Sequence, residues 1–121
     1  MQHTFVNVET PIGYIESGRD AIYLNSFEQI FNSIVMKGRI NSRFCSNEYQ
    51  NFKWYDYELK LKDVKAYKCE YIDIYAWKEW QTNSAISQVI DSEWHKQYKI
   101  NGAEYKHILV ETYDYIYFVL C

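Results

Sequence analysis

The last fifteen residues of the chain, HILVETYDYIYFVLC, constrain its fold more than any other stretch. They are almost entirely apolar or aromatic on both sides of a short interruption at residues 111–114. Residues 105–112 and 115–121 therefore predict two β-rich arms joined across Tyr113 and Asp114, which is an antiparallel hairpin. The second arm does not alternate between apolar and polar residues. We expect it to lie inside a sheet with both faces covered.

Two segments carry helical spacing instead. Residues 26–37 place five apolar side chains on one helical stripe, with Ser26 as a possible N-cap and Gly38 at the end; the five are Phe27, Ile30, Phe31, Ile34 and Val35. Residues 84–96 also favour a helix, with Ser84 as a possible cap, although a strand there would put Ser87, Val89, Asp91 and Glu93 on one side. Residues 39–51 are rich in Asn and Ser and predict a loop.

Strict alternation appears at residues 54–61, where Tyr55, Tyr57, Leu59 and Leu61 share one side of a predicted strand. A second alternating run follows Asp63, and its apolar face changes near Tyr71. The length of 121 residues is enough for one core, so we expect a single globular domain over residues 1–121. The predicted fold is α+β: a mainly antiparallel sheet of about five to seven strands with one or two helices packed on it.

Charge and cysteine content limit the classes of partner and the compartment that we expect for this protein. The net charge is −3, and residues 63–121 carry nine acidic against six basic side chains. Nucleic acid is therefore an unlikely partner, since phosphate binding needs clustered cations, while a basic protein is favoured. Cys45, Cys69 and Cys121 are odd in number and lack metal-ligand spacing. With no signal-like N-terminus and no apolar run of membrane-spanning length, these thiols predict a reduced, cytoplasmic protein without membrane segments.

No motif predicts catalysis, a metal or a cofactor. The three histidines are scattered, and no phosphate-binding loop or nucleophile motif is present. Two carboxylate pairs have a spacing that could support acid–base chemistry, Asp56 with Glu58 and Asp91 with Glu93, but solvated carboxylates are far commoner. The basic stretch KGRINSRF, followed by aromatic residues, is too small a footprint for nucleic acid. We therefore predict a non-enzyme.

The stretch YAWKEWQ is the best candidate for partner binding. Trp77 and Trp80 flank Glu79 in a segment without a clear apolar period, so exposure of one or both is expected. Exposed aromatic side chains ringed by charge have the composition of a protein-binding hot spot. The alternative is that both tryptophans fold back over an open end of the sheet. Asp91 and Glu93 complete the predicted partner-binding set as charge partners.

Three stretches resemble small bacterial immunity proteins of polymorphic or contact-dependent toxin systems. They are the Trp-Tyr-Asp-x-Glu-Leu strand at residues 54–59, Ser-Glu-Trp at 92–94, and the hairpin YKHILVETYDYIYFVL at 105–120. The resemblance implies a small, cytoplasmic, non-catalytic protein that occludes the active site of a toxin domain or an adjacent surface.

We therefore expect an immunity protein that neutralises a cognate toxin by forming a stoichiometric complex. In this hypothesis acidic residues steer a basic toxin, and aromatic anchors supply the lasting contact. Two alternatives stay open: a small ligand-binding protein or enzyme with a tyrosine-lined pocket, and a mobile-element inhibitor of host defence.

Overall fold

The computed structural model describes residues 4–8, 10–18, 20–46, 49–50, 53–71, 84–90 and 106–121. These residues form eight strands and one short 3-10 turn, η1 (Ser42–Phe44). The strands are β1 (Thr4–Asn7), β2 (Ile22–Ile30), β3 (Ser33–Asn41), β4 (Trp54–Leu61), β5 (Ala66–Tyr71), β6 (Ile86–Ile90), β7 (His107–Glu111) and β8 (Tyr115–Leu120).

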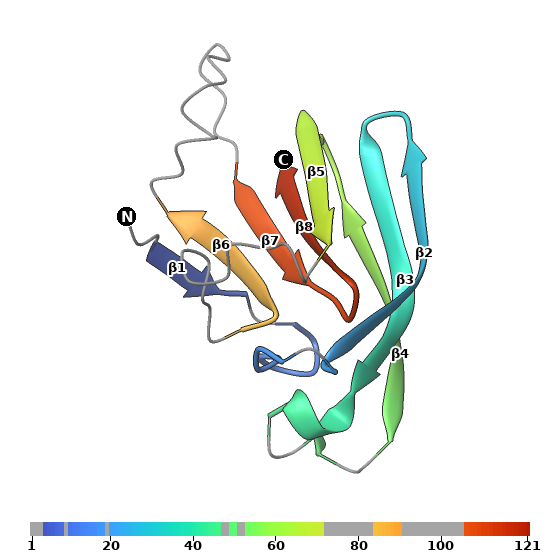
Figure 1. Ribbon diagram of the computed structural model, residues 1–121, viewed down its shortest axis with the longest axis vertical. Coiled ribbons are helices and arrows are strands. Elements are labelled where there is room, and N and C mark those ends of the chain that lie inside the picture. Colours follow the sequence, from blue (N-terminus) through green and yellow to red (C-terminus); the bar gives the residue numbers. More distant parts are fainter. Residues whose placement is uncertain are drawn as a thin grey trace.

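The strands make two antiparallel sheets. One has the order β1-β6-β7-β8-β5 and the other the order β2-β3-β4, and every paired neighbour runs antiparallel. Figure 1 shows the three-stranded sheet beside the β8 and β5 side of the five-stranded sheet. One cluster of buried side chains draws on both sheets, so the described residues form a β-sandwich.

The prediction of an α+β fold is wrong. The described residues contain no α-helix, and residues 26–37 instead form most of a hairpin between β2 and β3. Ile30 and Phe31, which the helical stripe would bury, lie exposed at the turn of this hairpin. Phe27 and Ile34 reach the core from two different strands. The hairpin thus reproduces helical spacing by accident, and the three β-branched residues of this segment favour the extended form.

The predicted loop at residues 39–51 and the predicted helix at 84–96 also need correction. Residues 39–41 continue β3, and only then does the chain turn through η1. Residues 86–90 form β6 between β1 and β7, whereas residues 91–96 lie outside the described part. Ile86, Ser87 and Val89 are all buried, so both faces of β6 are covered and the strand shows no alternation. A short run of this kind cannot be told from a helix by periodicity.

Two strand predictions are confirmed. β4 alternates between exposed and half-buried side chains over its full length, with Tyr55, Tyr57, Leu59 and Leu61 on the half-buried side. The C-terminal hairpin forms as β7 and β8, and β8 lies between β7 and β5. Residues 116–120 are buried without a break, as expected for a strand covered on both faces.

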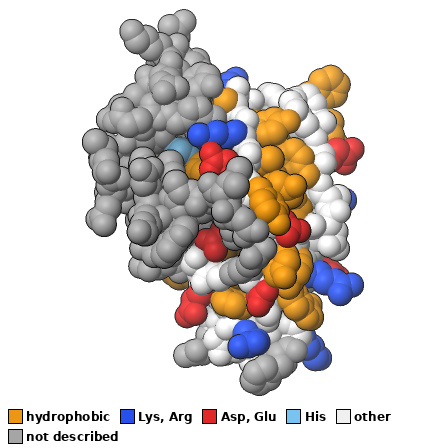
Figure 2. Space-filling view, viewed as in Figure 1, with side chains coloured by type: hydrophobic (Ala, Val, Ile, Leu, Met, Phe, Trp, Pro, Cys, Tyr) orange, Lys and Arg blue, Asp and Glu red, His pale blue; other side chains and the backbone are white. Residues whose placement is uncertain are grey.

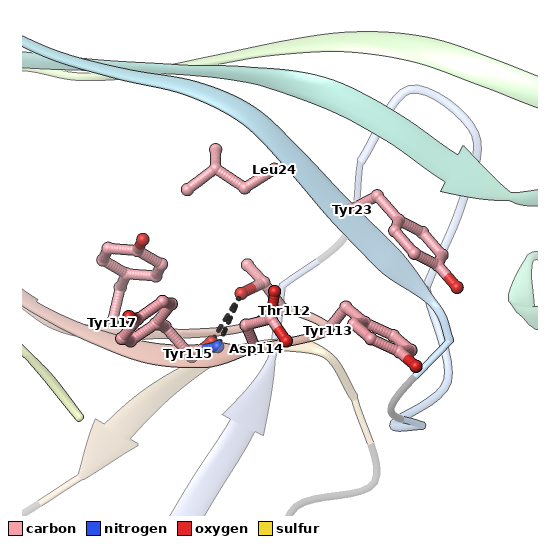
Figure 3. Close-up of a pocket in the computed structure, with 7 residues that line it drawn as sticks. All are labelled: Tyr23, Leu24, Thr112, Tyr113, Asp114, Tyr115 and Tyr117. Carbon is pink, nitrogen blue, oxygen red and sulfur yellow. Dashed lines mark hydrogen bonds between the residues drawn. The ribbon is translucent and has the colours of Figure 1, made fainter. Parts of the chain in front are cut away.

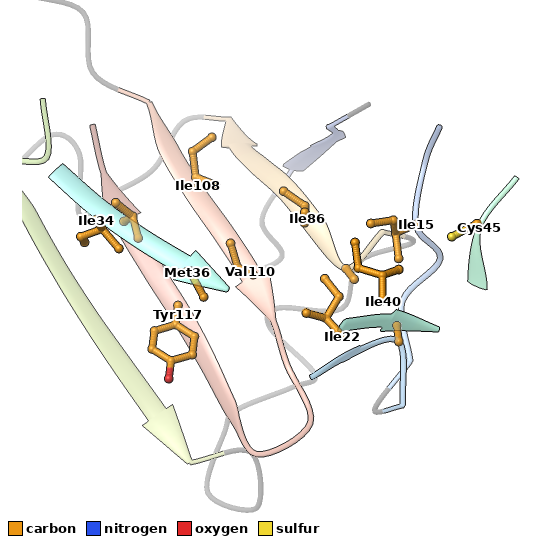
Figure 4. Close-up of a cluster of buried hydrophobic side chains, with 13 residues drawn as sticks. Ile15, Ile22, Ile34, Met36, Ile40, Cys45, Ile86, Ile108, Val110 and Tyr117 are labelled. Atoms are coloured by element: carbon orange, nitrogen blue, oxygen red, sulfur yellow. The ribbon is translucent and has the colours of Figure 1, made fainter. Parts of the chain in front are cut away.

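The core lies between the two sheets. Figure 4 shows Ile22, Ile34 and Met36 of the three-stranded sheet facing Val110 and Tyr117 of the five-stranded one. These side chains are fully or almost fully buried and belong to one close-packed cluster to which both sheets contribute. Tyr117 carries its ring into the layer from β8, where it meets the aromatic residues described next.

Candidate functional site

The partner-binding residues predicted from the sequence, Trp77, Glu79, Trp80, Asp91 and Glu93, all lie outside the described residues. Their role therefore stays a prediction. The described part of the chain has its own exposed aromatic side chains, including Trp54, Tyr67, Tyr71, Tyr113 and Tyr115. These side chains gather on one side of the molecule, and their arrangement identifies a second candidate surface.

A recess on the outer face of the three-stranded sheet is lined by Tyr23, Asn25, Arg39 and Trp54, and we call it the arginine recess. Its volume is about 510 Å³. Strand register builds it, because Arg39 on β3 lies opposite Tyr23 on β2 and Asp56 on β4. One recess thus combines two aromatic rings and a guanidinium drawn from all three strands.

Tyr23 connects the two sheets at this point. Its ring packs edge-on against Trp54, with centroids 5.1 Å apart and an interplanar angle of 75°. It also stacks on Tyr113 of the β7–β8 turn, with centroids 4.9 Å apart and an angle of 15°. The hydroxyl of Tyr23 donates a hydrogen bond to Asp20 over 3.3 Å. The ring is therefore held on both sides, which limits the entropy that partner binding would cost.

Gly38 makes this arrangement possible. It pairs with Leu24 on β2 and lies next to a register shift between Leu24 and Ser26. A β-carbon at this position would collide with the backbone carbonyl oxygen of Tyr23. The strands approach so closely only because the residue is glycine. Gly38 is thus a central position of β3 and does not end a helix.

A smaller recess continues from the other side of Tyr23, with a volume of about 170 Å³. We call it the turn recess, and its lining residues, drawn in Figure 3, are Tyr23, Leu24, Thr112, Tyr113, Asp114, Tyr115 and Tyr117. The Thr112 hydroxyl accepts a hydrogen bond from the backbone N–H of Tyr115 and donates one to its carbonyl, over 3.2 and 2.6 Å. These bonds fix the turn that presents Tyr113 and Asp114.

The aromatic surface extends along β2 and β5. Phe27 stacks on Tyr117, with centroids 5.3 Å apart, and contacts Tyr67 at 5.5 Å. The hydroxyl of Tyr67 donates to the Gln29 side chain over 3.0 Å. Tyr71 packs edge-on against Tyr115 at 5.6 Å. Figure 2 shows hydrophobic side chains gathered in a column over this region, with charged side chains beside it. The aromatic strip is our name for the two recesses together with the exposed side chains of Trp54, Tyr67, Tyr71, Tyr113 and Tyr115.

The carboxylate pair Asp56 and Glu58 faces cations on the next strand. The Arg39 Nε and Asp56 Oδ1 atoms are 3.8 Å apart, and the Lys37 Nζ and Glu58 Oε2 atoms 4.0 Å apart. All four side chains are largely exposed, so these ion pairs are weak and exchange readily. Lys37 and Arg39, the first two cations of the basic stretch, are thus balanced by acidic neighbours, which reduces their attraction for phosphate.

Two other features are absent from the described ranges. No three His, Cys, Asp or Glu side chains there are grouped to hold a metal ion. None of the helical structure in those ranges is long and apolar enough to cross a membrane.

An apolar cavity of about 400 Å³ lies elsewhere, between β4, β6 and the loop that follows β1. Its apolar lining includes Val8, Ile12, Ile40, Leu59 and Ile86. Tyr55 and Tyr57 also line it, although the turn recess has more tyrosines in its lining. Burial raises the pKa of the Tyr57 phenol well above its ordinary value, with a smaller contribution from Tyr117. The Tyr57 hydroxyl is buried, and no described group hydrogen-bonds to it.

Reasoning from sequence missed the arginine recess, although two signals pointed to it. Trp54 falls on the polar side of the alternating strand β4, among Asp56 and Glu58, which is an unusual place for a tryptophan. Tyr113 occupies a turn where small polar residues are usual. The sequence does not associate Tyr23 and Arg39 with them, because the spacing of residues 26–37 predicts a helix between the two. Comparisons with family models, curated proteins and solved structures find no match for this chain.

Proposed function

We propose that the protein is a non-catalytic binding module that recognises another protein through the aromatic strip. The observation that carries this proposal is the composition of the arginine recess. Tyr23, Arg39 and Trp54 line it together, and Trp, Tyr and Arg are the residue types most enriched in protein-binding hot spots. The Tyr23 ring packs edge-on against Trp54 and stacks on Tyr113, so it is held in place.

The dimensions of the strip suit a protein partner. β2, which borders it, has nine residues and so spans roughly 30 Å. A standard protein interface buries about 800 Å² on each partner, which a patch of this length can supply. The two recesses lie at one end of β2 and share Tyr23. Such a site offers pockets for partner side chains within a broader contact area.

The two recesses carry side chains of opposite charge. Arg39 lines one recess and Asp114 lines the other. The ion pair between Arg39 and Asp56 is exposed, so the guanidinium can exchange Asp56 for a carboxylate of the partner. Asp114 offers the matching site for a cation. Opposite charges at neighbouring recesses fix the orientation of a bound protein.

In its most specific form the proposal is an immunity protein that neutralises a cognate toxin in the cytoplasm by a stoichiometric complex. This form rests on the sequence resemblance at residues 54–59, 92–94 and 105–120, and Trp54 belongs both to that resemblance and to the arginine recess. A mobile-element inhibitor of host defence would use the same non-catalytic mechanism. The gene beside this one distinguishes the two: a toxin gene favours immunity.

The test is capture of a partner from the native host, followed by calorimetry with the purified captured protein. We expect a 1:1 complex that Trp54→Ala weakens at least tenfold without loss of fold. Tyr14→Ala is the matched control, because Tyr14 is an exposed aromatic residue outside the strip. Equal weakening by both variants, or no specific protein captured, contradicts the proposal.

A second candidate, binding of a small apolar molecule, is favoured by the cavity beside Tyr57. Its volume of about 400 Å³ falls in the range of ligand pockets. Native mass spectrometry of protein purified from the host would detect a retained ligand. Ile86→Trp, which fills the cavity, should abolish that retention and leave partner capture unchanged.

A further inference from the structure

The turn between β2 and β3 exposes a single aromatic side chain almost completely. Phe31 is 93% exposed, the highest value among the large hydrophobic residues of the described chain. Its neighbour Ile30 is 46% exposed. Water solvates such a ring poorly, so the fold gains nothing from this position. An exposed phenylalanine at a hairpin tip needs another explanation.

The backbone at Phe31 is also strained. Its φ is 53°, in the left-handed region that bulky side chains rarely adopt. Ile30 pairs with Ser33, so Phe31 is the first central residue of a two-residue turn. Turns with positive φ at this position usually carry glycine there. Phenylalanine thus destabilises the turn in two ways, through its backbone and through its exposed ring.

Surrounding contacts nevertheless fix the turn. The Gln29 amide donates to the Phe31 carbonyl over 3.3 Å, and the Val64 N–H donates to the Asn32 carbonyl over 2.8 Å. The Asn32 amide donates to the Asp63 carboxylate over 3.4 Å. The adjacent β4–β5 loop therefore holds the tip from one side. Strain that neighbouring structure maintains is characteristic of functional positions.

We propose that Phe31 is a preorganised anchor that inserts into an apolar pocket on the protein partner. This inference rests on the proposed function and adds a second contact point to it. β2 links the two points, since Tyr23 near its start lines the recesses and Phe31 follows its end, roughly 25 Å away. Because the turn is fixed, its backbone loses little entropy on binding, which favours Phe31 as an anchor.

A protein pocket suits this tip better than a lipid surface. One ring and one isoleucine are a small apolar area, and stable membrane attachment usually needs two independent signals. The flanking exposed charges are mixed, with Lys62 beside Asp63, so the tip has no strong attraction for anionic lipid. The partner pocket should therefore be apolar and wide enough for one phenyl ring.

The test uses the full chain, the captured partner and three variants: Phe31→Gly, Asp63→Asn and Trp54→Ala. Phe31→Gly should raise Tm by about 3–6 °C, because glycine adopts positive φ without strain. The same variant should weaken partner binding at least tenfold. Asp63→Asn keeps an oxygen acceptor for Asn32 and a residue that tolerates positive φ, so it should leave binding unchanged. Gain of stability with loss of binding is a result that a purely structural residue cannot give.

Several outcomes would overturn the inference. If Phe31→Gly lowers Tm, the turn is not strained. If Phe31→Gly binds as tightly as the wild type while Trp54→Ala is weakened, the anchor is wrong and the proposed function survives. If neither variant is weakened, or the host yields no partner, both are wrong. Phe31-dependent binding to phosphatidylcholine–phosphatidylglycerol vesicles, or Phe31-dependent self-association in sedimentation, would assign the ring to lipid or to a second copy and would also overturn it.

Discussion

Tyr23 and Tyr113 stack at 4.9 Å, although Tyr23 lies on the three-stranded sheet and Tyr113 on the β7–β8 turn of the other sheet. The backbone supports this contact, because the Tyr113 N–H donates to the Ile22 carbonyl over 2.9 Å. The β7–β8 turn is thereby fixed against the start of β2. The arginine recess and the turn recess share this junction, so the candidate surface depends on how the two sheets pack.

Removing one ring of this stack should weaken both the fold and the surface. We expect Tyr113→Ala to lower the free energy of unfolding by about 1 kcal/mol, the usual value of an aromatic pair. Urea unfolding measures it. Partner affinity should fall by more than this change in stability explains, since Tyr23 loses its support. Tyr14→Ala serves as the control, and an equal loss of affinity in that variant would contradict the role of the stack.

Gly38→Ala should be among the most damaging single-methyl changes in the chain. The added β-carbon meets the Tyr23 carbonyl, which belongs to the backbone and cannot move without separating β2 from β3. We expect a loss of about 3 kcal/mol in the free energy of unfolding, at the upper end for overpacking. Ser26→Ala, an exposed change on the neighbouring strand, should stay within about 0.5 kcal/mol. Similar thermal melts for the two variants would show that the strands adjust freely.

Secondary structure could be predicted from the sequence where one burial pattern runs through a whole segment. β4 has one solvated face, so its alternation gave both its type and its orientation. Residues 115–120 have no polar side, and this pattern alone predicted that β8 lies inside a sheet. The helix prediction for residues 26–37 is wrong because a tight hairpin brings Phe27 and Ile34 to the same core from two strands. The spacing alone does not distinguish this arrangement from one face of a helix, whereas the pairing of β3 with both β2 and β4 does.

The candidate surface was harder to foresee than the fold. The surface draws on four segments that share no local pattern, and these contribute Tyr23, Arg39, Trp54 and Tyr113. Their association needs the β2–β3–β4 register and the packing of the two sheets, both of which are long-range properties. Trp54 on the polar side of β4 and Tyr113 in a turn were the two visible signs. The predicted anchors Trp77 and Trp80 remain a separate prediction, which Trp80→Ala tests by partner affinity.

Glu111 should make the protein less stable at neutral pH than at mildly acidic pH. Burial raises the pKa of its carboxyl above the ordinary value of 4.5, although a hydrogen bond from Ser17 at 2.8 Å opposes this shift. As pH rises through 4.5, the unfolded state loses its proton first, so the contribution of Glu111 to the free energy of unfolding falls. Glu111→Gln should therefore be more stable than the wild type at pH 7. Urea unfolding at pH 4 and pH 7 measures the difference, which should shrink at pH 4; a less stable variant at pH 7 would contradict it.

Tyr117 should contribute to unfolding in alkali. Burial raises the pKa of its phenol to about 12, from an ordinary value of 10, with smaller contributions from Cys69, Tyr115 and Asp114. Between these pH values the unfolded state ionises while the folded state keeps its proton, so the free energy of unfolding falls as pH rises. Tyr117→Phe removes this phenol, and its stability should decline less steeply from pH 10 to pH 12. Tyr14→Phe, at an exposed site, should follow the wild-type curve; equal slopes for the wild type and both variants would exclude a role for Tyr117.

Deletion of residues 115–121 should abolish folding. These residues form β8, which hydrogen-bonds to β7 on one side and to β5 on the other, and the Lys65 N–H donates to the Leu120 carbonyl over 2.8 Å. Without β8 the remaining strands of the larger sheet separate, and the core loses Tyr117 and Val119. Circular dichroism should show no cooperative thermal transition. Removal of Cys121 alone is the matched control and should retain a cooperative melt. A sharp transition in the longer deletion would mean that the sandwich does not depend on its last strand.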